Sequence, residues 1–376
     1  MKFIHMADIH LDSPFTLEDP SRSDARRAEL RECFAKVFEY IREMDIPLCL
    51  ISGDIFEEEY ATKDTVAFVS GLFCSVPGCE FVIAPGNHDP YGKTGIYATT
   101  AFPENVHIFK NDEMGFFDFP NLNTTVYGWA FVSPVLETNP LINFKPSNPR
   151  RINLLCAHAD VGNGLSRYCP VGENDIAKSG LDYVALGHIH KGQKHVENTP
   201  VPWGYPGCLV GRDYGEPGQK GAFLCEAEKT YGAAKITVTA KRFSANRYED
   251  ESLNVTGACS NAEIINHVSA LIDKHGYSTD TLLRVTIKGS VSPQFTINAS
   301  EIKSMFYSRL YSFELRDATT PNFDVSALEK DMTVKGEFYR ALAPKLTTGT
   351  EEERKTASLA LRYGLSALNG NDFIDF

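Results

Sequence analysis

The stretch Pro85-Gly86-Asn87-His88-Asp89 constrains the fold of this chain more than any other, because it sets three polar side chains directly behind an apolar run. That run, residues 81–84, is closed by Pro-Gly, which is the pattern of a buried strand that enters a tight turn. In open α/β sheets, sites are built at the carboxyl ends of such strands. Turn chemistry alone also accounts for Asn, His and Asp after Pro-Gly, so the interpretation depends on the rest of the sequence.

Four further apolar runs end in residues that commonly bind metals. The runs at residues 2–7, 47–52, 151–156 and 183–186 are followed by Asp8 and His10, by Asp54, by His158, and by His188 and His190, respectively. A single buried histidine is more often a core residue than a ligand. Five strand ends of this kind in one chain favour a shared metal site instead.

Taken together, the motifs D-x-H, G-D, G-N-H-D, H and G-H-x-H resemble those of the calcineurin-like metallophosphoesterases, over roughly the first half of the chain and in the family's order. The resemblance implies a hydrolase with an α/β fold, a two-sheet α/β/β/α sandwich, that holds two divalent metal ions. It implies one ion bound by Asp8, His10 and His190, a second bound by Asn87, His158 and His188, a bridging carboxylate from Asp54, and His88 facing the scissile phosphate.

The residue types suit such a metal pair. Two cations roughly 3.5–4 Å apart can hold the attacking and leaving oxygens of a phosphate. Mixed imidazole, carboxylate and amide ligands favour manganese, iron or zinc over magnesium, which prefers oxygen and water. No thiolate is among the ligands, so a structural zinc site is disfavoured. The resemblance implies manganese, the usual metal of the family's nuclease members.

Composition limits the binding partners and the compartment. The net charge of −12 argues against strong unassisted binding to nucleic acid, so metal ions, a local basic loop or a partner would have to provide the affinity. We expect neither a membrane span nor a signal peptide, because the chain has no long apolar run and its apolar start is short. Nine cysteines without a C-x-x-C pair predict a reduced, cytoplasmic protein.

We expect three regions within the 376 residues. Residues 1–247 would form the phosphoesterase domain, with helices at residues 24–44 and 65–74, a second sheet drawn from residues 106–132, and strands at residues 222–226 and 236–240. Residues 211–221 form a Gly-rich loop from which Arg212 or Lys220 could contact phosphate, although an ordinary solvated loop explains it equally well.

Residues 250–320 predict a small α+β cap. A capping-box sequence at residues 260–263 begins a helix that ends near Gly276, and strands at residues 282–287 and 312–316 flank a helix at residues 300–310. Residues 321–376 would form a C-terminal helical segment, with helices at residues 335–346 and 355–368. The apolar faces of these helices could pack on this chain or dock on a partner helix.

This order of regions resembles the DNA-repair exonuclease branch of the family, the SbcD-type nuclease subunits. Residues 3–12, 51–56 and 205–207 are also similar to that branch, but many of its members carry His or Asp where this chain has Glu57, which leaves the role of Glu57 open. The resemblance implies a DNA exonuclease or endonuclease that works with an SMC-like ATPase subunit, with a homodimer as a further possibility. A phosphatase or phosphodiesterase for small molecules or phosphoproteins would use the same metals, and a non-catalytic adaptor is disfavoured because every expected ligand is present.

Overall fold

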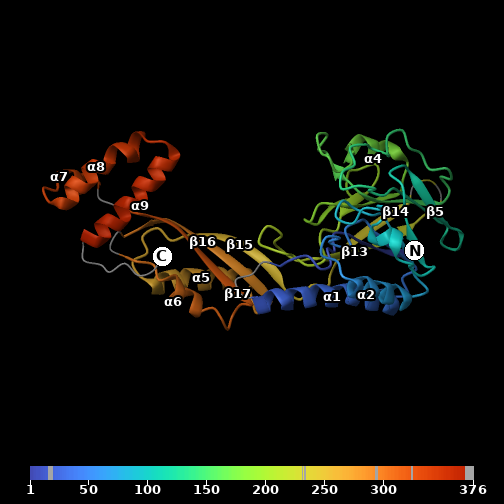
Figure 1. Ribbon diagram of the computed structural model, residues 1–376, viewed down its shortest axis with the longest axis horizontal. Helices are drawn as coiled ribbons and strands as arrows, with labels where there is room; N and C mark the ends of the chain where they lie inside the picture. Colours follow the sequence, from blue (N-terminus) through green and yellow to red (C-terminus); the bar gives the residue numbers. More distant parts are fainter. Residues whose placement is uncertain (16–19, 231, 233, 293–294, 323–324, 369–376) are drawn as a thin grey trace. The chain divides into compact units, whose positions relative to one another are not determined.

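The computed structural model describes residues 1–15, 20–230, 232, 234–292, 295–322 and 325–368 (Figure 1). The chain divides into two compact units, Met1–Arg247 and Tyr248–Phe376. Each unit is described by itself below.

Two six-stranded sheets build the first unit. One sheet has the order β14 (Lys235–Arg242), β13 (Gly221–Glu228), β1 (Lys2–Met6), β2 (Leu48–Ile51), β3 (Glu80–Ile83) and β4 (Val106–Ile108). The other has the order β11 (Gln193–His195), β12 (Trp203–Tyr205), β10 (Tyr183–Gly187), β7 (Ile152–His158), β6 (Thr124–Gly128) and β5 (Gly115–Phe119). Strands β1 to β4 are parallel, as are β6, β7, β10 and β12, whereas β5, β11, β13 and β14 are antiparallel to their neighbours.

The central strands read as unbroken apolar runs because both of their faces are buried. In β2, Cys49 and Ile51 pack with helices α1 (Pro20–Glu43) and α2 (Lys63–Cys74), while Leu48 and Leu50 pack against the second sheet. On the outer face of the second sheet, Ile176 of α4 (Glu173–Ser179) joins the core. The layers therefore follow the order helix, sheet, sheet, helix, and the predicted α/β/β/α sandwich is confirmed.

Two details of the first unit differ from expectation. We assigned residues 106–132 to the second sheet, but β4 pairs with β3 in the first sheet, and only β5 and β6 belong to the second. Helix α1 begins earlier than residue 24, at Pro20. The short elements α3 (Ile96–Thr99), η1 (Pro120–Leu122), β8 (Asp160–Val161) and β9 (Pro170–Val171) complete the unit.

The second unit begins with a three-stranded sheet in the order β15 (Arg247–Asn254), β16 (Thr281–Val291) and β17 (Ser312–Pro321), together with helices α5 (Asn261–His275) and α6 (Ala299–Ser304). The expected capping of α5 is present, since the hydroxyl of Ser260 accepts from the backbone N–H of Glu263 and Gly276 adopts a φ of 65° at the C-cap. Helix α6 is shorter than the predicted 300–310. Strand β15 escaped prediction because its sequence is mostly charged and polar.

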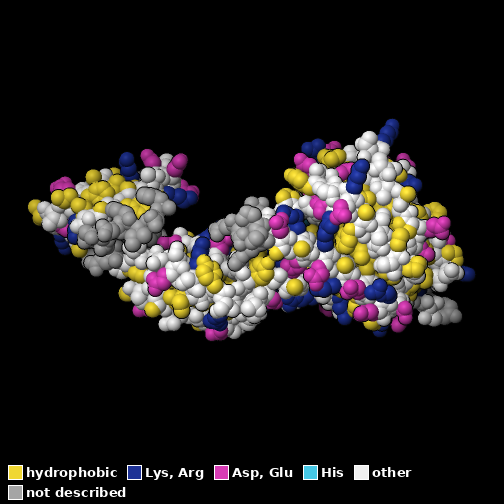
Figure 2. Space-filling view, turned by 60° about the horizontal axis from the view of Figure 1, so that its bottom comes forward, with side chains coloured by type: hydrophobic (Ala, Val, Ile, Leu, Met, Phe, Trp, Pro, Cys, Tyr) yellow, Lys and Arg dark blue, Asp and Glu magenta, His cyan; other side chains and the backbone are white. Residues whose placement is uncertain are grey.

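Three helices follow: α7 (Val325–Lys330), α8 (Val334–Thr348) and α9 (Glu351–Leu368). Leu361 and Leu365 of α9 are buried with Tyr339 of α8, so the apolar faces of α8 and α9 pack on each other within this chain. Leu359 and Tyr363, on another face of α9, are 51% and 45% exposed. No helix in the described part of the chain is both long and apolar enough to cross a membrane. On the face drawn in Figure 2, acidic and basic side chains are interspersed.

Candidate metal centre

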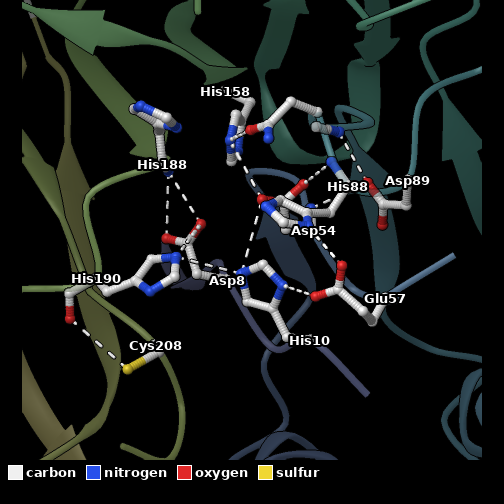
Figure 3. A network of polar contacts seen from close by, with 12 residues as sticks. Asp8, His10, Asp54, Glu57, His88, Asp89, His158, His188, His190 and Cys208 are labelled. Carbon is white, nitrogen blue, oxygen red and sulfur yellow. Dashed lines mark hydrogen bonds and ion pairs between the residues drawn. The ribbon is translucent and has the colours of Figure 1, made fainter. Parts of the chain in front are cut away.

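The strand ends singled out in the sequence meet at one place in the first unit (Figure 3). Asp8, His10, Asp54 and Asn87 follow β1, β2 and β3 of the first sheet, and His158, His188 and His190 come from β7 and the end of β10 in the second sheet. Asp8, His10, Asp54 and His188 have positive φ angles of 52°, 51°, 55° and 111°. Non-glycine residues in this backbone region are uncommon and concentrate at functional sites. The backbone of these turns therefore sets the orientation of the four side chains.

The first cluster consists of Asp8, His10 and His190, whose ligand atoms lie within 4.8 Å of one another. The Nδ1 of His10 donates to the carboxylate of Glu57 at 3.1 Å, and the Nδ1 of His190 donates to that of Glu216 at 2.6 Å. With its proton on Nδ1, a ring in this position presents a lone pair on Nε2. The two Nε2 atoms face each other at 3.2 Å, and a cation bound between them would turn this repulsion into coordination.

In a second cluster, around His158, a hydrogen bond at Nδ1 again leaves Nε2 as the acceptor. The Nδ1 of His158 donates to the backbone oxygen of Ser52 at 3.0 Å, which leaves the Nε2 lone pair pointing at the side-chain oxygen of Asn87 at 2.9 Å. A carboxylate oxygen of Asp54 lies 3.4 Å from this Nε2 and 3.7 Å from the Nε2 of His10. Acceptor atoms thus converge at two neighbouring points with Asp54 between them, and this donor set fits two divalent cations that share one carboxylate.

His188 takes a different position from its neighbours. Its backbone N–H donates to both carboxylate oxygens of Asp8, at 3.0 and 3.2 Å. Its ring lies 5.2 Å from the ring of His158 and 4.9 Å from that of Tyr168. Among the described residues, the three groups of acidic and histidine side chains that could hold a metal do not include His188. The role of its imidazole as a ligand stays a prediction.

Burial sets the protonation of these groups. It lowers the pKa of His10 and of His158, and it lowers the pKa of His188 to about 4, which favours the neutral imidazole, the form that binds metals. Burial also raises the pKa of Asp8. At Asp54 burial acts in the same direction, but the imidazoles of His158 and His10 outweigh it and hold the pKa below its usual value.

The sequence model of the family "Calcineurin-like phosphoesterase" matches residues 1–192, which is half of the chain. The protein belongs to the calcineurin-like phosphoesterase family. It is 28% identical over 311 residues to the uncharacterized metallophosphoesterase YhaO of Bacillus subtilis, a match that covers 80% of this chain and 74% of the relative. It is 22% identical over 253 residues to the DNA double-strand break repair protein Mre11 of Methanopyrus kandleri, covering 61% of this chain and 54% of that protein.

Membership makes the protein a hydrolase with a metal site, and it gives the observed clusters their chemistry. The predicted ligands other than His188 lie in the two clusters, which could hold metal ions through side-chain nitrogen and oxygen atoms. We refer to Asp8, His10, Asp54, Asn87, His158 and His190 below as the metal centre.

His88 stands at the edge of the metal centre of this phosphoesterase. Its backbone N–H donates to Asp54 at 2.9 Å, and its side chain is 40% exposed. The ring Nδ1 lies 2.6 Å from the carboxylate of Glu57, and this hydrogen bond raises the pKa of His88. With Nδ1 engaged, Nε2 is the ring atom that remains to meet a substrate, and the role of His88 toward the phosphate stays a prediction.

Asp89 and Glu216 support the metal centre, and sequence reasoning gave neither a role. Asp89 is buried and accepts hydrogen bonds from the backbone N–H groups of Gly86, Asp54, Ile55 and Phe56 and from the hydroxyl of Tyr97. It therefore fixes the turn that carries Asp54. The place of Asp89 in the Gly-Asn-His-Asp motif could have indicated its role from the sequence. For Glu216 the only sequence feature is its place in the Gly-rich loop.

The two residues expected to contact phosphate lie differently. Arg212 is anchored by Glu216 at 2.8 Å, lies 4.0 Å from Glu57 and keeps 22% of its side chain exposed, so it borders the metal centre. Lys220 is only 5% exposed, and its ammonium donates to the backbone oxygen of His190 at 2.9 Å. The expectation of a solvated loop is therefore wrong for Lys220, because its side chain is drawn inward by that carbonyl.

Proposed function

We propose that this phosphoesterase is a DNA nuclease of the SbcD-type branch, an exonuclease or endonuclease that acts in DNA repair with manganese as its metal. The observation that carries the proposal is the similarity to the repair protein Mre11. That alignment covers 61% of the chain, which is more than the half matched by the family alone. Similarity to a repair protein that reaches beyond the common catalytic core favours a nucleic-acid substrate over a small molecule.

The residues of the chain have separable tasks in such a reaction. Two cations held by the metal centre would neutralise the phosphodiester and activate water as the nucleophile. Glu57 holds His88 by its Nδ1, which would leave Nε2 available to the leaving oxygen. Because the hydrogen bond to Glu57 raises its pKa, His88 keeps its proton to higher pH and can donate it as the bond breaks.

The test is digestion of end-labelled DNA with manganese, with and without EDTA. We expect metal-dependent cleavage of DNA and of bis-p-nitrophenyl phosphate, and little hydrolysis of phosphomonoesters or phosphoproteins. His88→Gln should lower DNA turnover by roughly 10²–10⁴, the usual range for loss of a general acid. It should cost less on the nitrophenyl diester, whose leaving group needs little protonation. Hydrolysis of monoesters or phosphoproteins without any cleavage of DNA would refute the nuclease and favour a metallophosphatase.

We also propose an SMC-like ATPase as partner and the cytoplasm as the compartment. The nine cysteines are all free, and seven of them are buried, which suits a reducing environment. Because Leu361 and Leu365 pack within the chain, docking would use the exposed side chains of Leu359 and Tyr363 on α9. Changing Leu359 and Tyr363 to Glu should abolish co-purification with the ATPase and leave the helix content unchanged. Undiminished co-purification would exclude this face, and size-exclusion chromatography of the chain alone tests for a homodimer.

A further inference from the structure

A pocket of about 320 Å³ lies in the first unit, between the outer strands of the two sheets. Its walls come from β11 and the residue just after β12 (Trp203–Tyr205) on one side, and from β13, β14 and the residues just before β13 on the other. Lys194, Lys220 and Arg242 line it along with Gln193 and Gln219, and its described lining holds no aspartate or glutamate. We call this the basic pocket. It is a local concentration of positive charge on a chain whose net charge is −12.

Strand register places two of the cations on the inner side of the pocket. Lys194 pairs with Gly204, and a side chain at Gly204 would point at the ring of Phe223, which lies in the core between the sheets. Arg242 pairs with Gly221, two residues before Phe223, and therefore shares that face. The guanidinium of Arg242 donates to the backbone oxygens of Ser244 and Ala245, at 2.8 and 2.6 Å, which holds it in place.

Lys241 also borders the basic pocket, but its charge points elsewhere. It pairs with Ala222 on the opposite face of the strands, and its ammonium lies over the ring of Tyr40 of α1, 5.8 Å from the ring centre. Its backbone forms part of the pocket wall, because a side chain at Gly221 would meet the backbone oxygen of Lys241. Lys194 and Lys220 therefore offer their charge to a ligand, and Arg242 is a basic part of the pocket wall.

Lys220 supplies the independent argument for an anion. Its side chain is 5% exposed, and its ammonium donates to the neutral backbone oxygen of His190, whereas no carboxylate among the described residues forms an ion pair with it. Lysines are rarely buried without a counter-charge, because removing an ammonium from water is costly unless an opposite charge compensates it. An anion in the pocket would provide that charge.

We propose that the basic pocket binds a phosphate group. Basic side chains, the amide of Gln219 and glycine-rich walls match the charge and the hydrogen-bonding oxygens of phosphate, and the volume admits a nucleotide-sized ligand. The phosphate can come from a polynucleotide strand held beside the metal centre, or from free phosphate or a mononucleotide. Because Lys220 joins the pocket to the backbone of His190, the site adjoins the metal centre and is distinct from it.

The test uses the full chain in EDTA, so that no metal ion can bind the probe. Isothermal titration calorimetry with inorganic phosphate at constant ionic strength should show one saturable site. Lys194→Ala and Lys220→Met should weaken binding about tenfold or more, as expected for loss of one charge-assisted hydrogen bond. Lys191→Ala is the matched control, since Lys191 is exposed three residues away and does not line the pocket.

The outcomes separate the pocket from the nuclease proposal. The proposed phosphate site is overturned if no phosphate binds, or if Lys194→Ala and Lys191→Ala bind phosphate equally well. Because Lys194 is exposed, this comparison holds even if Lys220→Met fails to fold. A single-stranded oligonucleotide and a deoxynucleotide monophosphate then identify the source. If the strand is the ligand, Lys194→Ala should reduce the salt slope of oligonucleotide binding by about one. A loss confined to the mononucleotide would identify a site for free phosphate. Phosphate binding without any DNA cleavage would refute the nuclease and leave the pocket standing.

Discussion

Glu57 is the position where this chain departs from many SbcD-type proteins, and Glu57→Gln is the most informative substitution. One carboxylate oxygen accepts from the Nδ1 of His88 at 2.6 Å and the other from the Nδ1 of His10 at 3.1 Å. Glutamine keeps the shape but offers one acceptor and one NH₂ group. Whichever way the amide turns, one imidazole must give up its proton on Nδ1.

Each alternative has a definite cost. If His10 changes tautomer, its Nε2 carries the proton and no longer faces the metal centre as a lone pair. If His88 changes instead, it loses the charged partner that raises its pKa. The Glu57 side chain is only 14% exposed, so its hydrogen bonds are shielded from solvent. A hydrogen bond to a charged group contributes about 1.5–3 kcal/mol, so we expect turnover to fall roughly 10- to 150-fold.

The assay is the pH profile of diester hydrolysis at saturating manganese, together with metal content. A general acid must be protonated, so a raised pKa keeps the enzyme active to higher pH. In Glu57→Gln the pKa of His88 falls, and the alkaline limb of the profile should move to lower pH. Glu59→Gln, the same change at an exposed position two residues away, should leave rate and profile unchanged. Equal behaviour of the two variants would refute the reasoning. Loss of one metal ion in Glu57→Gln would mean that Glu57 acts on the metal centre, either by orienting His10 or as a ligand itself, since it groups with His10 and His88.

Three further predictions follow from packing and burial. A side chain at Gly86 would collide with the carboxylate of Asp54, so Gly86→Ala should abolish binding of at least one metal ion. Gly71→Ala is the control, because Gly71 has open space around it in α2, and this variant should bind both ions and gain about 0.5–1 kcal/mol of stability in denaturant titrations. Leu361→Glu should unfold the packed pair α8 and α9, seen as lost helix signal and faster proteolysis, while Leu359→Glu at a half-exposed position should not. Burial lowers the pKa of His5 to about 3, so the folding stability that is present above pH 6.5 is lost as the pH falls. In His5→Gln the free energy of unfolding should therefore change less steeply with pH than in wild type, by up to about 1.4 kcal/mol per pH unit between pH 6 and 4.

The sequence predicts the sandwich and the place of the metal centre for one physical reason. Strands buried on both faces are continuous apolar runs, and the polar residue that ends each run lies at the carboxyl edge of its sheet. Residues 106–132 lack this signal, because alternation indicates a strand without indicating which sheet it joins. Strand β15 had no apolar signal at all, since its alternate faces carry charged side chains.

What the sequence does not contain is the set of partners that fix each ring. His10 meets Glu57 across 47 residues, and His190 meets Glu216 across 26, and nothing in either local sequence indicates these pairs. His188 illustrates the same limit, because a motif cannot distinguish a residue that presents its ring from one that presents its backbone N–H. The structure shows the N–H of His188 on Asp8 and leaves its ring beside Tyr168.

These outer partners decide what the metal centre can do. Because an acceptor holds the Nδ1 proton of His10 and of His158, both rings present Nε2 as a lone pair, and those lone pairs lie near the oxygens of Asp54 and Asn87. Such convergence of acceptors without a donor destabilises the fold unless a cation is present. The same arrangement therefore favours a bound cation, and it places the Nε2 of His88, whose Nδ1 is held by Glu57, at the exposed edge.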